Sequence, residues 1–288
     1  MNLQQQDNTG NLLGILPITQ QDSIDTIENN QYFKTYNIYF IPFLLIIKWI
    51  FFGVMIIFYN SDTIDDSTYD NYDLFWFSIF QQCDDCSDLR LQCWRLLTYS
   101  MLHTDVYHLI LNTVSFLVFG GILEYFIGIV SILVIFFSSV IFSAISTAYC
   151  SPYSIIVGSS GGAYGMLGGW FGSSIVNWNI FNRISKLAIT FMFILVLGIS
   201  LLDYYYNRDD RTAYYVHLVG FIYGFSVSIC IVKQGCKVDY FKYIKLLNNL
   251  LLLTMSCVLM YEYITLHNSK DIRYVNKCCY IGEVSLKI

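Results

Sequence analysis

Seven apolar stretches dominate the pattern of hydrophobic and polar positions along the chain. Each approaches the roughly 20 residues that a helix needs to cross the hydrocarbon core of a bilayer. Unpaired backbone groups are not tolerated in lipid, and barrel strands are shorter and alternate, so these runs predict helices. They cover approximately residues 39–59, 107–126, 128–150, 161–178, 187–202, 214–232 and 246–266. The pattern predicts an all-α, polytopic membrane protein with one membrane domain, residues 39–266.

The two ends of the chain are polar. Residues 1–38 are acidic and rich in Gln and Asn, which predicts a disordered tail, and residues 267–288 form a C-terminal tail. The first apolar run begins near residue 39, so we expect that run to be the targeting signal, with no cleaved signal peptide or Arg-rich presequence. The short loops on the same side of the membrane as the N-terminus hold more Lys and Arg than the loops on the opposite side, which indicates a cytosolic N-terminus.

Composition agrees with the pattern and narrows the function classes. Hydrophobic residues make up 56% of the 288 residues and charged residues only 13%, against about 25% charged in soluble domains. So many apolar residues cannot all be buried in one globular core, so we expect the protein to lie in a lipid bilayer. The formal net charge of −5 argues against nucleic acid as a partner.

The long connection between the first two stretches, residues 60–106, changes character along its length. It begins acidic, and residues 74–80 are apolar and aromatic, which favours a segment lying in the membrane interface. Cys83, Cys86 and Cys93 follow. A disulfide is the favoured interpretation, because a redox motif would need a thioredoxin-like context and a zinc site a fourth ligand.

A serine between glycines begins the fourth stretch, in Gly158-Ser159-Ser160-Gly161. Glycine on either side lets backbones approach closely and permits unusual dihedral angles. At the start of a helix, the N–H of Ser160 and those of its neighbours lack helical partners and are available to an anion. Ser160 is therefore a candidate nucleophile.

The sixth stretch carries a candidate base, His217. A neutral imidazole accepts a proton from a serine hydroxyl at neutral pH. Glycines at 161, 165 and 169 and at Gly220 and Gly224 predict that the two helices pack closely, as small-xxx-small faces do in membranes. Tyr164 lies one turn after Ser160, on the same face, and could orient the base.

Donors for a developing oxyanion are found at the start of the second stretch. His108 and Asn112 are four residues apart and so project from one face of a helix. A ring N–H and a side-chain amide are both hydrogen-bond donors. A water-filled cavity with these groups would support acyl transfer.

Each of these residues also has a structural explanation. A serine at a helix start is often an N-cap, and the glycines can serve packing alone. His103, His108 and His217 could share a metal ion, although the chain has no H-E-x-x-H motif and no carboxylate partner for such a site. What favours hydrolysis is the order H-x-x-x-N, G-x-S-G and H-x-x-G-x-x-x-G in one chain.

In that order the motifs resemble those of the rhomboid intramembrane serine proteases, over roughly residues 90–232. The resemblance implies Ser160 as nucleophile, His217 as base and Tyr164 as the ring stacked on it. It implies His108 and Asn112, with the Ser160 N–H, as oxyanion donors. Further matches are Trp94-Arg95 in the first loop, His103 as an additional histidine and Glu124 as a structural glutamate.

Two positions depart from the family pattern, Ser159 and Val216, where alanine is more common. The extra span lies after the six-helix core, at residues 246–266, which is similar to the secretory-pathway class of the family and not the mitochondrial class. With the acidic tail, this favours the Golgi, endosomal or plasma membrane.

The resemblance implies an endopeptidase that cleaves single-span transmembrane proteins, without a metal or organic cofactor. Two other interpretations stay open. A related protein that binds transmembrane helices for trafficking or degradation would lack the Ser/His pair, which is present here. A small-solute transporter would show internal repeats, and we find none.

Overall fold

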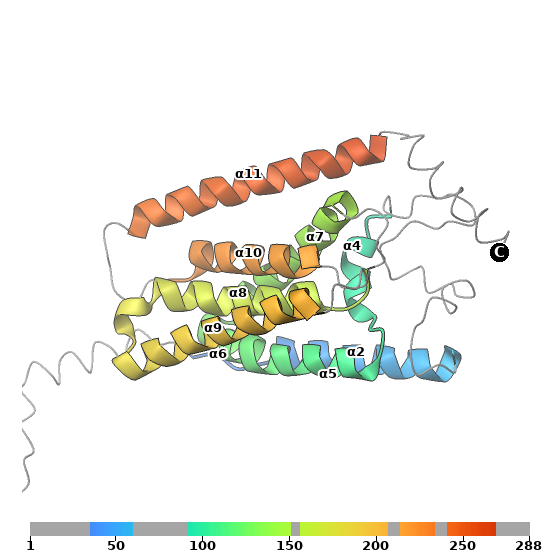
Figure 1. The fold of residues 1–288 in the computed structure, drawn as a ribbon, viewed down its shortest axis with the longest axis horizontal. Coiled ribbons are helices and arrows are strands. Elements are labelled where there is room, and N and C mark those ends of the chain that lie inside the picture. Colours follow the sequence, from blue (N-terminus) through green and yellow to red (C-terminus); the bar gives the residue numbers. More distant parts are fainter. Residues whose placement is uncertain (1–34, 60–91, 151–155, 207–213, 234–240, 269–288) are drawn as a thin grey trace, which may run out of the picture. The chain divides into compact units, whose positions relative to one another are not determined.

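The apolar stretches form helices, as their length and lack of alternation require. A computed structural model describes residues 35–59, 92–150, 156–206, 214–233 and 241–268. In chain order the elements are α2 (Phe40–Tyr59), α4 (Arg95–Thr98), η3 (Tyr99–Met101), α5 (Val106–Ser115), η4 (Phe116–Gly121), α6 (Ile122–Ile127), α7 (Ile129–Cys150), α8 (Ser160–Val176), η5 (Trp178–Ile180), α9 (Arg183–Tyr206), α10 (Tyr214–Ile231) and α11 (Phe241–Asn268) (Figure 1). The predicted all-α class is confirmed.

Six helical segments in the described part of the chain are long and apolar enough, by length and composition, to cross a bilayer. They are α2, the continuous run α5–η4–α6, α7, α9, α10 and α11. α8 is not among them, because its 17 residues reach only about 25 Å at 1.5 Å per residue. The described residues therefore contain one candidate span fewer than the seven expected from the sequence.

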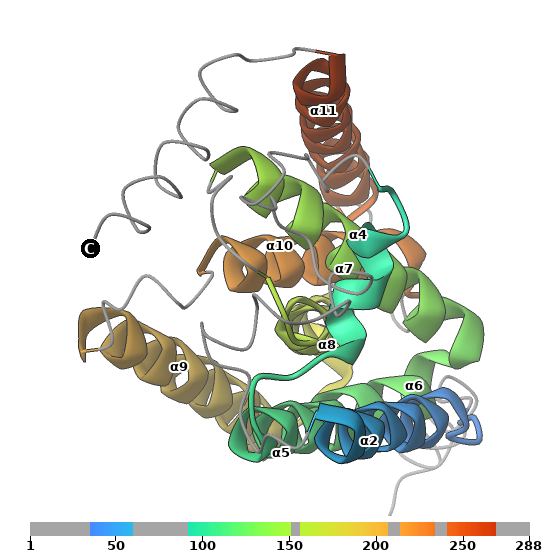
Figure 2. The same cartoon turned by 90° about the vertical axis from the view of Figure 1, so that its right-hand side faces the viewer.

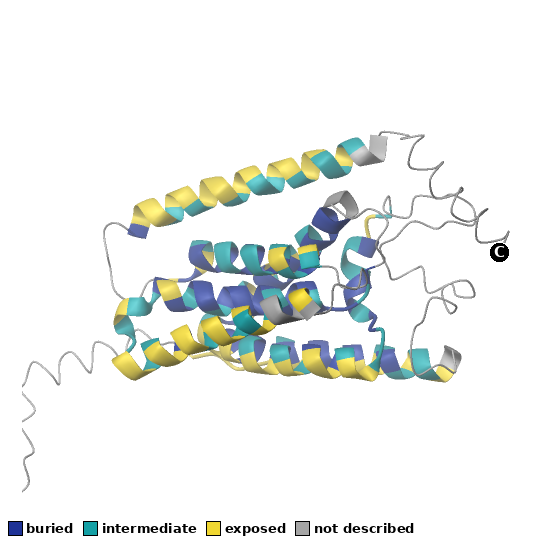
Figure 3. Ribbon diagram, viewed as in Figure 1, coloured by how far each residue is buried: buried dark blue, intermediate teal, exposed yellow. Residues whose placement is uncertain are grey.

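α8 lies at the centre of the bundle. Seen along its axis, it has α7 and α10 on one side and α5 and α6 on the other (Figure 2). Most of its residues are buried, whereas α9 and α11 expose most of theirs (Figure 3). The outer helices thus present large apolar side chains outward, as helices surrounded by lipid do.

The backbones of α8 and α10 touch. A methyl group on Gly220 would meet the carbonyl oxygen of Gly161, and one on Gly224 would meet that of Gly165. The predicted close packing of the two helices is confirmed at these four positions. Such contact brings main chains together without a hydrophobic driving force, through van der Waals packing.

The third glycine predicted for this contact, Gly169, faces elsewhere. A methyl group there would meet Leu123 and Ile135, whereas Gly168 would meet the Phe221 carbonyl of α10. The reason is the 3.6-residue turn, which leaves position i+7 about 20° from position i and position i+8 about 80° away. The α10-facing row of α8 therefore continues from Gly165 to Gly168.

Glu124 closes the N-terminus of α2. Its Oε1 accepts hydrogen bonds from the N–H groups of Tyr39 (2.9 Å) and Phe40 (2.7 Å), and its Oε2 accepts one from Ile41 (2.9 Å). The first N–H groups of a helix have no partner within the helix, and a carboxylate there is favoured by the helix dipole. The side chain is fully buried, which agrees with a structural role.

Several sequence predictions fall outside the described residues. These are the disordered tail up to residue 34, the interfacial segment 74–80, the disulfide expected among Cys83, Cys86 and Cys93, of which the structure describes only Cys93, and most of the C-terminal tail. They stay predictions.

Gly224→Ala should destabilise the bundle, because its methyl group would fall on the Gly165 carbonyl of α8. Overpacking of this kind costs about 1–3 kcal/mol. Thermal unfolding in detergent micelles measures the effect. Gly198→Ala on α9 is the matched control, since no atom lies within 4 Å of its added methyl. Equal unfolding midpoints for the two variants would contradict the backbone contact.

Candidate active site

The chain turns sharply at Gly158, just before α8. The φ angle of Gly158 is +106°, a conformation in which L side chains are strained. Its N–H donates to the Tyr99 carbonyl at 3.2 Å, so η3 holds the turn from the first loop. The turn leads directly into α8, whose first residue is Ser160.

The two adjacent serines have different surroundings. Ser159 is fully buried, and its Oγ lies 3.1 Å from Nε2 of His103. Ser160 is partly exposed. Ser159, not Ser160, occupies the N-cap position of α8, and its side chain makes no capping hydrogen bond. The structure therefore gives no support to the interpretation of Ser160 as a simple N-cap.

His217 lies in the first turn of α10 with its ring stacked on Tyr164 of α8. The two ring centroids are 4.3 Å apart and the ring planes differ by 9°. The Tyr164 hydroxyl in turn lies 3.3 Å from the Ser200 hydroxyl of α9. Parallel stacking restricts the plane of the imidazole, so the ring of His217 is held against Tyr164.

Contacts between their neighbours bring Ser160 and His217 to the same end of the bundle. A methyl group on Gly161 would lie 3.0 Å from Cγ1 of Val216. Since Ser160 precedes Gly161 and His217 follows Val216, both polar residues lie where α8 and α10 begin their contact. Ser143 of α7 supports this region by donating to the Val216 carbonyl at 3.0 Å.

Asp105 begins α5 and fixes the backbone of His108. Its Oδ1 accepts the His108 N–H at 2.8 Å, as an N-cap does. Burial alone would raise the pKa of Asp105, but hydrogen bonds from the His108 N–H and the Thr104 hydroxyl hold that pKa below its ordinary value. The carboxylate is therefore ionised at neutral pH.

The Thr104 hydroxyl links this carboxylate to the ring of His108. It lies 2.9 Å from Asp105 Oδ2 and 3.1 Å from His108 Nδ1. A hydroxyl has one proton, so when Thr104 donates to Asp105 it accepts from Nδ1–H, and Nε2 of the neutral ring is an acceptor. When Thr104 turns to donate to Nδ1, Nε2 carries the proton and is a donor.

His108 lies beside the Gly158 turn, in the first turn of α5, and Asn112 follows it one helical turn later. A methyl group on Gly158 would be 2.5 Å from Cε1 and 2.9 Å from Nε2 of His108. Asn112 is buried, and its amide nitrogen has no hydrogen-bond partner within the described residues. A buried donor without a partner costs about 1–3 kcal/mol, which a ligand oxygen would offset.

His103 contacts both Ser159 of the turn and the ring of His108. It contacts Ser159 through Nε2, and its ring centroid is 5.3 Å from that of His108. Burial, with the charges of Lys48 and His108, lowers the pKa of His103 to about 2. The ring is neutral at physiological pH, and its hydrogen bond with Ser159 supports the turn before α8.

The described ranges contain no group of three or more His, Cys, Asp or Glu side chains that could hold a metal ion.

Trp94 of the first loop is 47% exposed, whereas its neighbour Arg95 is buried. The Arg95 Nε donates to the Gln92 side chain at 2.6 Å, and burial lowers the pKa of Arg95 to about 10.

Two residues near the site escaped the sequence analysis. Lys48 is fully buried in α2 and donates to the Ser100 carbonyl, and Ser200 meets Tyr164. For Lys48 a signal existed, because it is the only charged residue of the first apolar stretch and charges inside spans are usually functional. Ser200 carried no such signal.

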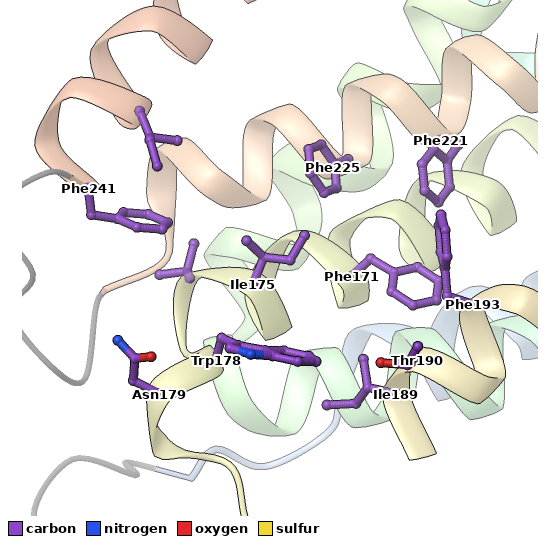
Figure 4. Close-up of a pocket in the computed structure, with 12 residues that line it drawn as sticks. Phe171, Ile175, Trp178, Asn179, Ile189, Thr190, Phe193, Phe221, Phe225 and Phe241 are labelled. Atoms are coloured by element: carbon purple, nitrogen blue, oxygen red, sulfur yellow. The ribbon is translucent and has the colours of Figure 1, made fainter. Parts of the chain in front are cut away.

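An apolar cavity of about 590 Å³ lies away from these residues, between α8, α9, α10 and the start of α11. Figure 4 shows aromatic rings gathered along it, with Trp178 and Asn179 at one end. None of the predicted catalytic residues lines it. Its walls are Phe171, Ile175, Val176, Trp178, Asn179, Ile189, Thr190, Phe193, Phe221, Phe225, Phe241 and Ile244.

Comparison with known proteins finds a Rhomboid domain at residues 90–234. RHOMBOID-like protein 6, mitochondrial, from Arabidopsis thaliana is 30% identical over 143 residues, which cover 49% of this chain and 44% of that protein. RHOMBOID-like protein 2 from the same plant is 29% identical over 143 residues, 50% of this chain and 44% of that protein. Rhomboid-related protein 2 from Mus musculus is 24% identical over 149 residues, 50% of this chain and 49% of that protein. The chain spans under half the length of these relatives.

The matched segment takes in about half of the chain and contains the Gly158 turn and all of α8 and α10. It also contains His103 in the first loop and His108 in α5. The chain therefore belongs to the rhomboid family of membrane proteins.

Proposed function

We propose that the protein is an intramembrane serine endopeptidase with Ser160 as nucleophile and His217 as general base. The observation that carries the proposal is the stacking of His217 on Tyr164, 4.3 Å between centroids, at the end of the α8–α10 contact where Ser160 begins α8. A base whose ring plane is fixed beside a partly exposed serine is the arrangement that nucleophilic catalysis requires.

In this mechanism His217 takes the proton of the Ser160 hydroxyl as Oγ attacks the scissile carbonyl carbon. The tetrahedral intermediate collapses, the protonated base gives its proton to the leaving amine, and an acyl-enzyme remains. A water molecule, deprotonated by the same imidazole, then releases the acid product and restores the serine. Water is the only co-reactant that this sequence of steps consumes.

The oxyanion would be held by the Ser160 N–H, the Asn112 amide and Nε2 of His108. The Asn112 amide nitrogen supports this role, because it is a buried donor for which the described residues provide no acceptor. His108 donates through Nε2 only when the Thr104 hydroxyl turns away from Asp105 to donate to Nδ1, which gives up the hydrogen bond from Thr104 to Asp105. Each such donor contributes about 3–4 kcal/mol to the stability of the transition state.

The substrates would be single-span membrane proteins cleaved in or near the bilayer. A transmembrane helix hides its carbonyl groups in its own hydrogen bonds, so the segment cleaved must unwind, which small helix-breaking residues favour. In this proposal α8 counts as a seventh, short span inside the ring of longer helices, and α11 is the extra C-terminal span.

The position of the extra span supports a compartment of the secretory pathway, at the Golgi, endosomal or plasma membrane. A fluorescently tagged full-length chain, imaged in cells with organelle markers, should coincide with one of these membranes. The word mitochondrial belongs to the name of one relative, and overlap of the tagged chain with a mitochondrial marker would contradict the compartment proposed.

Labelling with a fluorophosphonate probe tests the nucleophile. Wild-type protein in detergent should react covalently, and Ser160→Ala should lose both labelling and cleavage of a single-span reporter substrate. Ser159→Ala is the matched comparison and should still label, although more slowly, because its hydroxyl supports the turn through His103 and is not the nucleophile. A Ser160→Ala protein that still cleaves would refute the assignment, and a folded but inert wild type would favour a protein that only binds transmembrane helices.

Gly158→Ala should lower the labelling rate on the order of 100-fold, because a small displacement of catalytic groups costs about that much. Its methyl would strain the positive-φ turn and collide with the His108 ring. Gly121→Ala in η4, where an added methyl meets no atom within 4 Å, should label at the wild-type rate. Similar labelling rates for both variants would show that the position of His108 does not depend on the absence of a side chain at residue 158.

A further inference from the structure

Lys48 is a lysine buried inside a membrane-spanning helix, and neither the hydrolytic mechanism nor the packing of α2 calls for it. Its side chain is fully buried, at 0% exposure. An ionisable group at such depth is expensive, so its presence points to a function and to a specific partner. The rest of α2 is apolar, and a leucine would fill the position at no electrostatic cost.

The partner of Lys48 is a backbone carbonyl in the first loop. Nζ donates to the Ser100 oxygen at 2.9 Å. The amino group also lies 5.1 Å from the ring centroid of Phe116 and 5.7 Å from that of Phe136. Aromatic faces attract a cation, so the cage of one carbonyl and two rings holds the amino group in one place.

The segment held by Lys48 is the one that supports the nucleophile. Tyr99, next to Ser100, accepts the Gly158 N–H at 3.2 Å, and His103 lies 3.1 Å from the Ser159 hydroxyl. These two contacts engage the two residues that directly precede Ser160. The charge of Lys48 also reaches His103 and helps to keep that ring neutral.

We propose that Lys48 is a positioning residue, which fixes the first-loop segment from Tyr99 to His103 and through it the Gly158-Ser159 turn that presents Ser160. The inference rests on the proposed hydrolase function, because it assigns Lys48 an effect on that reaction. Lys48 acts through the Ser100 carbonyl and makes no contact with Ser160 or His217 among the hydrogen bonds described.

The test compares Lys48→Met with Lys48→Gln. The two new side chains have the same length, but only Gln can donate to the Ser100 carbonyl. We expect Lys48→Met to lower the fluorophosphonate labelling rate and the kcat for a single-span reporter by about 10- to 100-fold. KM should not change, since the fully buried Lys48 side chain has no surface to offer a substrate, and Lys48→Gln should recover part of the loss.

Thermal stability separates positioning from packing. Replacing a buried charge by an apolar side chain of similar size is often neutral or stabilising, so the unfolding midpoint of Lys48→Met should equal or exceed that of wild type. Lys245→Met is the matched control. Lys245 also donates to a backbone carbonyl, that of Val232 at 2.7 Å, but at the opposite end of α10 from His217, and its loss should leave kcat unchanged.

Two results would overturn the proposal for Lys48. One is a Lys48→Met protein that labels and cleaves at the rates of an active wild type, a result that would leave the hydrolase function intact. The other is a loss of activity equal in the Met and Gln variants and matched by an equal loss of stability, which would make Lys48 a packing residue. A wild type that neither labels nor cleaves would refute the hydrolase function itself, and the role of Lys48 in it.

Discussion

Contact between the main chains of α8 and α10 is the constraint on which the rest of the structure depends. Glycines 161 and 165 on one helix and 220 and 224 on the other leave no room for a single added methyl group. At that separation the first turns of both helices are adjacent, and Ser160 and His217 fall within them. The outer helices expose apolar surfaces that suit lipid, and some of them add polar contacts to the pair, as Ser200 of α9 does to Tyr164.

Around this contact, buried polar groups form hydrogen bonds between segments that are far apart in the chain. Glu124 joins α6 to α2, and Lys48 joins α2 to the first loop. His103 and Tyr99 then join the first loop to the turn before α8. In lipid, where apolar side chains gain little by leaving their surroundings, such hydrogen bonds supply the specificity that a hydrophobic core supplies in water.

The sequence was sufficient for the helical class and for most helix positions, because long apolar runs are local signals. The stacking of Tyr164 on His217 was an expectation from the family resemblance, since spacing alone places Tyr164 only on the same face as Ser160. The sequence was not sufficient for Gly169, whose face depends on the rotation of α8 after two turns. Nor did it reveal that Ser159 meets His103, or that Lys48 meets Ser100, since these pairs lie 56 and 52 residues apart and depend on how separate segments fold together.

Glu124 gives α2 an end that is completed late. The carboxylate that caps Phe40 lies 84 residues further along the chain, so the ribosome makes the whole first helix, the first loop and most of the second span before the cap exists. During that interval the first amides of α2 depend on water or lipid headgroups. Entry of the second span then supplies the carboxylate. The N-terminus of the first span is therefore completed only together with the second span.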